Sequence, residues 1–135
     1  MLYAMRRGNV EGYNEGQEPI VHLVSTIQNV QAAKLPFVFT DGHGTMAPLT
    51  DFFDDLLQLD RIDWQLMRAR YWADTVQDPD RARRRQAEFL VHRVFPWSLI
   101  TGIGVVNSRM KKQVEQILQG VTYHPGVAIR KDWYY

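Results

Sequence analysis

Short apolar runs separated by polar turns dominate the chain, and they set its expected secondary structure. Runs of Val, Ile, Leu and Phe bounded by turn-forming residues are typical of buried strands. They predict strands at residues 20–24, 37–40, 86–92, 99–106 and 127–129. Apolar residues at helical spacing predict amphipathic helices at residues 48–59 and 108–120. Short connections favour antiparallel neighbours, so the pattern predicts an α+β domain around a mostly antiparallel sheet.

Small polar residues mark where several of these elements begin and end. Ser25 is expected to cap a short helix after the first strand, and Ser108 to cap the long C-terminal helix. Thr50 is expected to cap the helix at residues 48–59. Residues 75–84 are polar and include a proline, so we expect an exposed loop there.

Composition narrows the class of protein. The chain has 135 residues, 45% of them hydrophobic, which fits one domain at residues 1–135 with enough apolar side chains for a core. Its apolar stretches are too short or too interrupted to span a bilayer, and the first residues lack the apolar part of a secretory signal, so no membrane association is expected. The absence of cysteine excludes thiolate chemistry and suits a cytoplasmic protein.

The formal net charge is only +1, but the charged residues are unevenly distributed. Four arginines between residues 81 and 85 form a basic cluster suited to phosphate contacts. The aspartates at residues 51–55 fall on the polar face of the expected helix, so we expect no metal there. The four histidines lack metal-ligand spacing, and His43, in a glycine-flanked turn, is expected to be structural.

One carboxylate is unusual because it lies within an apolar strand. Glu88 directly follows the arginine cluster and shares a strand face with Leu90 and His92, so it needs partners to stay charged. We therefore interpret Glu88 as a functional residue. An alternative groups Glu88 with Asp78 and Asp80 as the Mg²⁺ ligands of a nuclease. Leu90 occupies the position of the lysine that such sites use, which weakens this alternative.

Longer motifs follow one another in a fixed order along the chain. The most distinctive are Phe39-Thr40-Asp41-Gly42-His43 and Gln86-Ala87-Glu88-Phe89-Leu90-Val91. The others lie at residues 19–25, 35–38, 52–56, 59–64, 70–72, 78–85 and 133–135. This ordered series resembles the DarT family of DNA ADP-ribosyltransferases, and the resemblance covers essentially the whole chain. A series of this length is far more specific than any single short motif.

The resemblance implies a fold, an activity and a set of site residues. The fold is ADP-ribosyltransferase-like, a split and mostly antiparallel β-sheet with short helices that binds NAD as co-substrate, with no metal. The activity is transfer of ADP-ribose to thymine bases in single-stranded DNA, as the toxin of a toxin–antitoxin pair whose macrodomain antitoxin removes the modification. The family's catalytic glutamate maps onto Glu88. Its DNA contacts map onto Tyr3, Arg6, Arg7, Asp74, Thr75, Arg83, Arg84, Arg85 and Gln86.

Members of this family carry a further segment before the region matched here. That segment contains the strands that bind NAD and an arginine that acts on NAD, so we expect this chain to be N-terminally incomplete. The alternative function is a truncated, catalytically inactive module that retains DNA or antitoxin binding.

Overall fold

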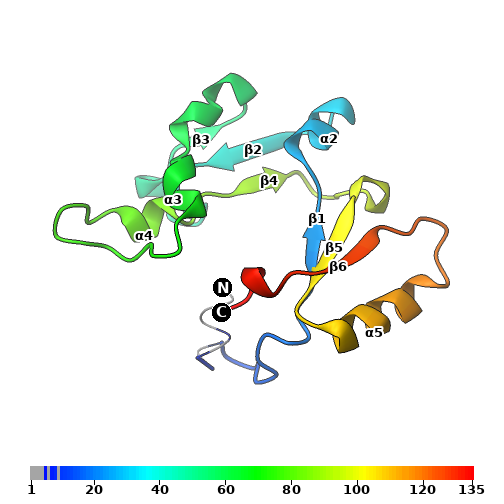
Figure 1. Cartoon of the computed structure of the whole chain (residues 1–135). Helices are drawn as coiled ribbons and strands as arrows, with labels where there is room; N and C mark the ends of the chain where they lie inside the picture. Colours follow the sequence, from blue (N-terminus) through cyan, green and yellow to red (C-terminus); the bar gives the residue numbers. More distant parts are fainter. Residues whose placement is uncertain (1–4, 6, 9) are drawn as a thin grey trace. The chain divides into compact units, whose positions relative to one another are not determined.

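The structure, a computed structural model, describes residues 5, 7, 8 and 10–135. The chain divides into two compact units, the first formed by residues 1–29 and 96–135 and the second by residues 30–95. Helix α2 (Ile27–Ala32) is the point at which the chain passes from the first unit into the second. Each unit contains a three-stranded sheet, which confirms the mixed α+β class (Figure 1).

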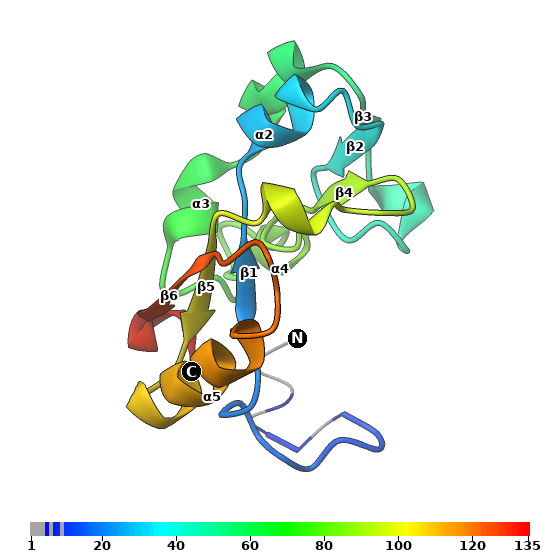
Figure 2. The same ribbon diagram turned by 90° about the vertical axis from the view of Figure 1, so that its right-hand side faces the viewer.

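The sheet of the first unit is built from β1 (His22–Val24), β5 (Gly102–Val105) and β6 (Gly126–Ile129), in the order β1-β5-β6. β1 is antiparallel to β5, whereas β6 is parallel to it. The crossover between the parallel strands is α5 (Ser108–Leu118), which packs beside them (Figures 1 and 2). Two short 3₁₀ helices, η3 (Trp97–Leu99) and η4 (Lys131–Trp133), complete this unit.

The C-terminal residues of the first unit rest directly on its central strand. A Cβ atom on Gly104 would lie 2.6 Å from Cε3 of Trp133, so only glycine allows the indole ring to approach this closely. The Tyr134 hydroxyl donates a hydrogen bond to the Ile20 carbonyl at 2.6 Å. The ring of His22 meets both aromatic rings edge-on, and burial lowers the pKa of this histidine.

The sheet of the second unit has the order β3-β2-β4 and is antiparallel throughout. Its strands are β2 (Phe37–Thr40), β3 (Phe52–Phe53) and β4 (Phe89–Val91). Phe39 is 1% exposed and stacks between Phe53 at 5.2 Å and Phe89 at 6.3 Å. Because successive side chains of a strand alternate between its faces, Thr40 and Glu88 point away from these phenylalanines.

Four short helices surround this second sheet: η1 (Ala47–Leu49), η2 (Leu56–Arg61), α3 (Trp64–Arg68) and α4 (Arg81–Arg84). The prediction of one helix at residues 48–59 is therefore wrong, since that stretch contains η1, β3 and η2. Its phenylalanines pair with β2 instead, because a tertiary partner overrides a helical pattern this short. Thr50 is buried and donates to the His43 carbonyl at 3.1 Å instead of capping a helix.

Other boundaries also differ from the sequence prediction. Thr26, not Ser25, caps α2 by accepting a hydrogen bond from the Asn29 N–H, while the Ser25 hydroxyl donates to the Leu99 carbonyl. Asn107 caps α5 in place of Ser108. The predicted loop at residues 75–84 ends in α4, and the strands predicted at residues 86–92 and 99–106 are shorter than expected. Within the described residues, no helix is long and apolar enough to cross a membrane.

Candidate active site at Glu88

The backbone of Glu88 is held in place by hydrogen bonds to Thr40. It immediately precedes β4, opposite Thr40 at the end of β2. The Thr40 N–H donates to the Glu88 carbonyl at 2.9 Å, and the Glu88 N–H donates to Oγ1 of Thr40 at 3.1 Å. Thr40 is fully buried, so water does not compete for these bonds. The position from which the carboxylate projects is therefore fixed by the sheet.

The Glu88 carboxylate is half-buried and is held by a backbone donor. The Gly44 N–H donates a hydrogen bond to Oε2 of Glu88 at 2.9 Å. A Cβ atom on Gly44 would lie 3.2 Å from the same oxygen, so glycine permits this close approach. Oε1 accepts no hydrogen bond from the described residues. One oxygen is thus oriented while the other is left to accept a hydrogen bond from a ligand or to face a developing positive charge.

The loop that carries Gly44 joins β2 to β3 and is itself closed by hydrogen bonds. Oγ1 of Thr40 donates to the Gly42 carbonyl at 2.7 Å. The Asp51 N–H donates to Oδ1 of Asp41 at 2.9 Å, joining the two ends of the loop. His43 lies within it, and its Nδ1 accepts a hydrogen bond from the Thr45 N–H at 3.2 Å. This local contact fits the structural role expected for the histidine.

Three members of the arginine cluster are engaged by carboxylates, and Arg81 forms the longest of these pairs, 3.7 Å from Asp78. Nε and Nη2 of Arg83 donate to the two carboxylate oxygens of Asp80, at 2.7 and 2.9 Å. Nη1 of Arg84 donates to Oδ2 of Asp63 at 2.9 Å, and its Nη2 donates to Oδ2 of Asp78. The hydrogen bond from Arg83 lowers the pKa of Asp80, and Asp80 in turn raises the pKa of Arg83. Their role in DNA binding remains a prediction, and their positive charges are already balanced within the protein.

Arg85 differs from these arginines. It forms no ion pair with a carboxylate of the described residues, and its Nη1 donates to Sδ of Met67 at 4.0 Å. Its Nε is buried without a hydrogen-bond partner among the described residues. Gln86 is exposed, and its side-chain nitrogen donates to the Ala82 carbonyl at 2.9 Å.

Two predicted DNA contacts, Asp74 and Thr75, lie in the loop that leads into α4. Oδ1 of Asp74 accepts a hydrogen bond from the Ala82 N–H at 2.8 Å. Thr75 closes a turn with Asp78 through both its backbone and its hydroxyl. Both side chains are exposed and already take part in local hydrogen bonds.

The remaining predicted DNA contacts lie near the N-terminus. Arg7 is exposed and belongs to the first unit. Tyr3 and Arg6 lie outside the described residues.

The geometry gives no support to the nuclease alternative. Asp78 and Asp80 are paired with arginines, whereas Glu88 is bonded to Gly44. Among the residues that the structure describes, no group of three or more carboxylates or histidines is placed to hold a metal ion.

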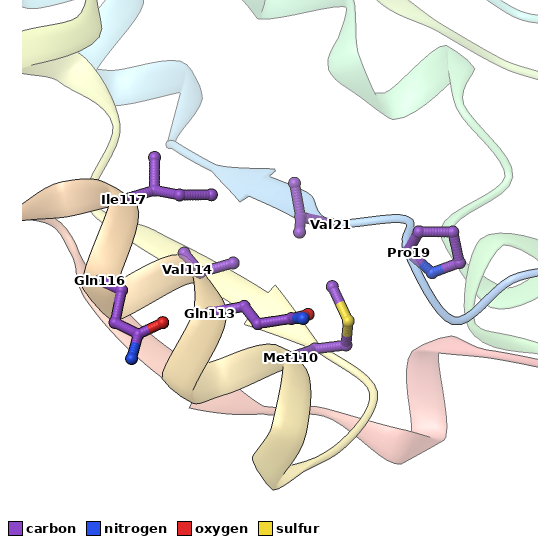
Figure 3. A pocket seen from close by; sticks show the side chains of 7 residues that line it. All are labelled: Pro19, Val21, Met110, Gln113, Val114, Gln116 and Ile117. Atoms are coloured by element: carbon purple, nitrogen blue, oxygen red, sulfur yellow. The ribbon is translucent and has the colours of Figure 1, made fainter.

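The first unit also has a hollow, but none of the predicted site residues lines it. It is an open groove of about 530 Å³ along α5, formed by Pro19, Val21, Met110, Gln113, Val114, Gln116 and Ile117. Figure 3 shows that these side chains converge from the helix and from the segment that leads into β1. The groove contains no titratable group, so it offers no acid, base or nucleophile.

Comparison with known proteins decides the family. The model of one family, described as "ssDNA thymidine ADP-ribosyltransferase, DarT", matches residues 1–135. The chain belongs to the DarT family. This confirms the resemblance drawn from the motif series. Glu88 lies within one of these motifs, so the geometry described above concerns a residue that the resemblance includes.

Characterised relatives include DarT-family enzymes from two Thermus strains. A DNA ADP-ribosyl transferase of Thermus sp. (strain 2.9) is 48% identical over all of this chain and 63% of its own length. One from Thermus aquaticus is 42% identical, with 58% of its length covered. This chain therefore spans about three-fifths of these relatives.

Solved structures of a DarT relative agree with the fold. The Thermus sp. 2.9 DarT in complex with NAD⁺ has a TM-score of 0.92 and 47% identity, covering 99% of this chain and 66% of that chain. The same protein in complex with ADP-ribosylated single-stranded DNA gives the same TM-score, with 63% of that chain covered. The DarT fold expected from the sequence is confirmed.

Sequence reasoning selected Glu88 as a candidate, which stays a prediction, and missed the residues that hold it in this DarT-family chain. Thr40 and Gly44 bind Glu88 directly, and neither has a side chain that suggests chemistry. The signal available was a strand that ends in a Thr-Asp-Gly-His-Gly turn, 44 residues before the glutamate. The donor is the backbone N–H of Gly44, which every residue except proline has, so the sequence of the turn could not indicate that it binds Glu88.

Proposed function

We propose that this chain supplies the catalytic and DNA-binding part of an NAD-dependent transferase that adds ADP-ribose to thymine bases in single-stranded DNA. Family membership and the fixed carboxylate of Glu88 support the proposal. The observation that carries it is the Gly44 hydrogen bond to Oε2, which leaves Oε1 without a partner among the described residues and so able to meet a substrate. A carboxylate oriented in this way suits a reaction in which positive charge develops on a sugar.

The described residues fit NAD at one point, the Glu88 carboxylate. Bound NAD supplies the ADP-ribosyl group when its bond to nicotinamide breaks. Glu88 accepts a hydrogen bond from a ribose hydroxyl through Oε1 and places negative charge beside the ribose. The backbone bonds to Thr40 keep that charge in place, so little reorganisation accompanies the reaction. The thymine must be unpaired to reach this carboxylate, which favours single-stranded DNA.

Among Arg83, Arg84 and Arg85, the last is best suited to bind a phosphate. Arg83 pairs with two aspartates and Arg84 with three, so a phosphate would have to displace a carboxylate to reach either of them. Arg85 has no such competitor among the described residues. We expect Arg85→Ala to weaken DNA binding for all sequences and to lower the salt slope of log affinity by about 1. A salt slope equal to that of the unchanged protein contradicts this assignment.

The test of activity uses NAD, a short single-stranded oligonucleotide containing thymine, and mass spectrometry of the product. The expected result is a mass increase of one ADP-ribose, absent from an oligonucleotide of the same length without thymine. Glu88→Gln should lower the rate by at least about 100-fold, the usual size of a lost electrostatic contact in a transition state. Glu115→Gln, the same change at an exposed position of α5, is the matched control and should retain the rate.

Because the chain spans about three-fifths of its relatives, the assay is run on two proteins. One is the chain itself, and the other is the chain joined to the part of the Thermus sp. relative that it does not match. If neither protein modifies the oligonucleotide, the proposal is overturned. Salt-sensitive DNA binding without modification by either protein would establish the alternative, an inactive binding module.

Two further parts of the proposal rest on the family alone. A macrodomain antitoxin is the expected partner, and it should remove ADP-ribose from the modified oligonucleotide. The expected place of action is the cytoplasm, where NAD and DNA are both present. Failure of a macrodomain hydrolase to reverse the modification contradicts the first of these.

A further inference from the structure

The loop that binds Glu88 needs a support of its own. Residues 41–50 join β2 to β3 without regular structure except η1, and Gly44 lies within this loop. A backbone N–H can orient a carboxylate only if the loop itself keeps one conformation. The contacts that hold the loop therefore determine where Oε2 of Glu88 lies.

Arg83 lies on α4, outside the loop, and forms several hydrogen bonds that hold the loop in place. Its Nη1 donates to Oδ2 of Asp41 at 3.1 Å and to the Leu49 carbonyl at 3.0 Å, so one guanidinium group bridges the two ends of the loop. The Asp41 carbonyl lies 3.4 Å from the same nitrogen. Asp80 binds the other two nitrogens of the guanidinium and so fixes its plane.

The loop is shaped to accept this arginine. A Cβ atom on Gly42 would lie 2.9 Å from Nη1 of Arg83 and 3.0 Å from Oγ1 of Thr50, so a larger residue would displace one of them. Gly42 is buried, and the Arg83 side chain is 21% exposed. The guanidinium therefore lies against the loop backbone two residues before Gly44.

We propose that Arg83 is a positioning residue, which fixes the loop of residues 41–50 and through the Gly44 N–H sets the orientation of the Glu88 carboxylate. Its consequence for catalysis rests on the proposed function, whereas its consequence for the Gly44 hydrogen bond does not. Each of the three nitrogens of the guanidinium donates a hydrogen bond inside the protein, so we assign Arg83 to the loop and not to the phosphates of DNA.

The test observes the Gly44 amide in the folded protein by ¹H–¹⁵N NMR. Glu88→Gln provides the reference, because it removes the charged acceptor and should move the Gly44 signal. Arg83→Met keeps the aliphatic stem and removes the donors, and it should move that signal in the same direction. Amide exchange at Gly44 should become at least about tenfold faster, the factor expected for loss of a charge-assisted hydrogen bond.

A matched control separates this effect from general destabilisation. Arg109→Met removes an equally charged arginine, paired with Glu18, that contacts neither the loop nor Asp80, so the Gly44 signal should stay in place. The chemical shift of a folded protein reports the local bond and does not follow the free energy of unfolding. A Gly44 signal unchanged by Arg83→Met overturns the proposal.

A second variant keeps the test decisive if Arg83→Met does not fold. Asp41→Asn retains one acceptor oxygen and leaves the contacts of Arg83 with Asp80 and Leu49 in place. It should produce a smaller shift of the Gly44 signal in the same direction, and no shift would overturn the proposal.

Kinetics complete the test in a protein that shows transferase activity. Misplacing the carboxylate should lower kcat on the order of 10- to 100-fold with little change in the KM for DNA. A raised KM for DNA with unchanged kcat would instead identify Arg83 as a phosphate contact and overturn its positioning role. A shifted Gly44 signal, when neither the chain nor its fusion to the Thermus sp. segment modifies DNA, supports the positioning role and rejects the proposed function.

Discussion

The hydroxyl group of Thr40 links the sheet, the glycine loop and the glutamate, which makes Thr40→Val an informative substitution. This hydroxyl donates to the Gly42 carbonyl at 2.7 Å and accepts from the Glu88 N–H at 3.1 Å. Valine has the same shape but neither bond, and the site is 0% exposed, so water cannot replace them. Each orphaned buried group costs about 1–3 kcal/mol, and the added methyl returns about 1 kcal/mol. With two such groups, the expected loss is about 1–5 kcal/mol in the free energy of unfolding.

Urea unfolding of Thr40→Val and Thr40→Ser measures this loss. Serine keeps the hydroxyl and removes only a buried methyl group, which costs about 1 kcal/mol. If the hydrogen bonds dominate, the serine variant is the more stable of the two, the reverse of the order set by apolar burial. A valine variant as stable as the unchanged protein, or more stable than the serine variant, refutes the reasoning.

Three further substitutions test other parts of the structure. Gly44→Ala places a Cβ atom 3.2 Å from Oε2 of Glu88, so transferase activity should fall about tenfold or more while the urea midpoint changes little; equal activity contradicts the contact. Burial lowers the folded-state pKa of His22 below 6.5, so stability should fall as pH drops below that value; urea midpoints at pH 7 and 5.5 should show this slope, and His22→Gln should remove it. Gly104→Ala must displace the Trp133 ring and should cost about 1–3 kcal/mol in urea unfolding, and an unchanged midpoint contradicts the close packing.

The candidate site was only partly predictable from the sequence. Glu88 could be selected from residue type and spacing alone, because a carboxylate next to an apolar strand is unusual and needs a reason to be there. The role of Arg83 could not, because a basic cluster is compatible with both phosphate binding and internal ion pairs. Only the fold brings Asp41 and Leu49 to the same guanidinium group, from positions 42 and 34 residues away along the chain.

Local pattern predicted the strand at residues 37–40 and the helix after residue 107, and in both places the tertiary partners agree with the pattern: β2 pairs with β3 and β4, and α5 packs on β5 and β6. The motif series also determined the family, because it depends on residue identity and order alone. The tertiary structure decided the rest. Phe52 and Phe53 occupy a strand because β2 offers them a partner, and this pairing outweighs the helical spacing of residues 48–59. The Glu88 carboxylate takes its orientation from a distant backbone N–H, and a hydrogen bond between residues 44 positions apart exists only once the sheet has formed.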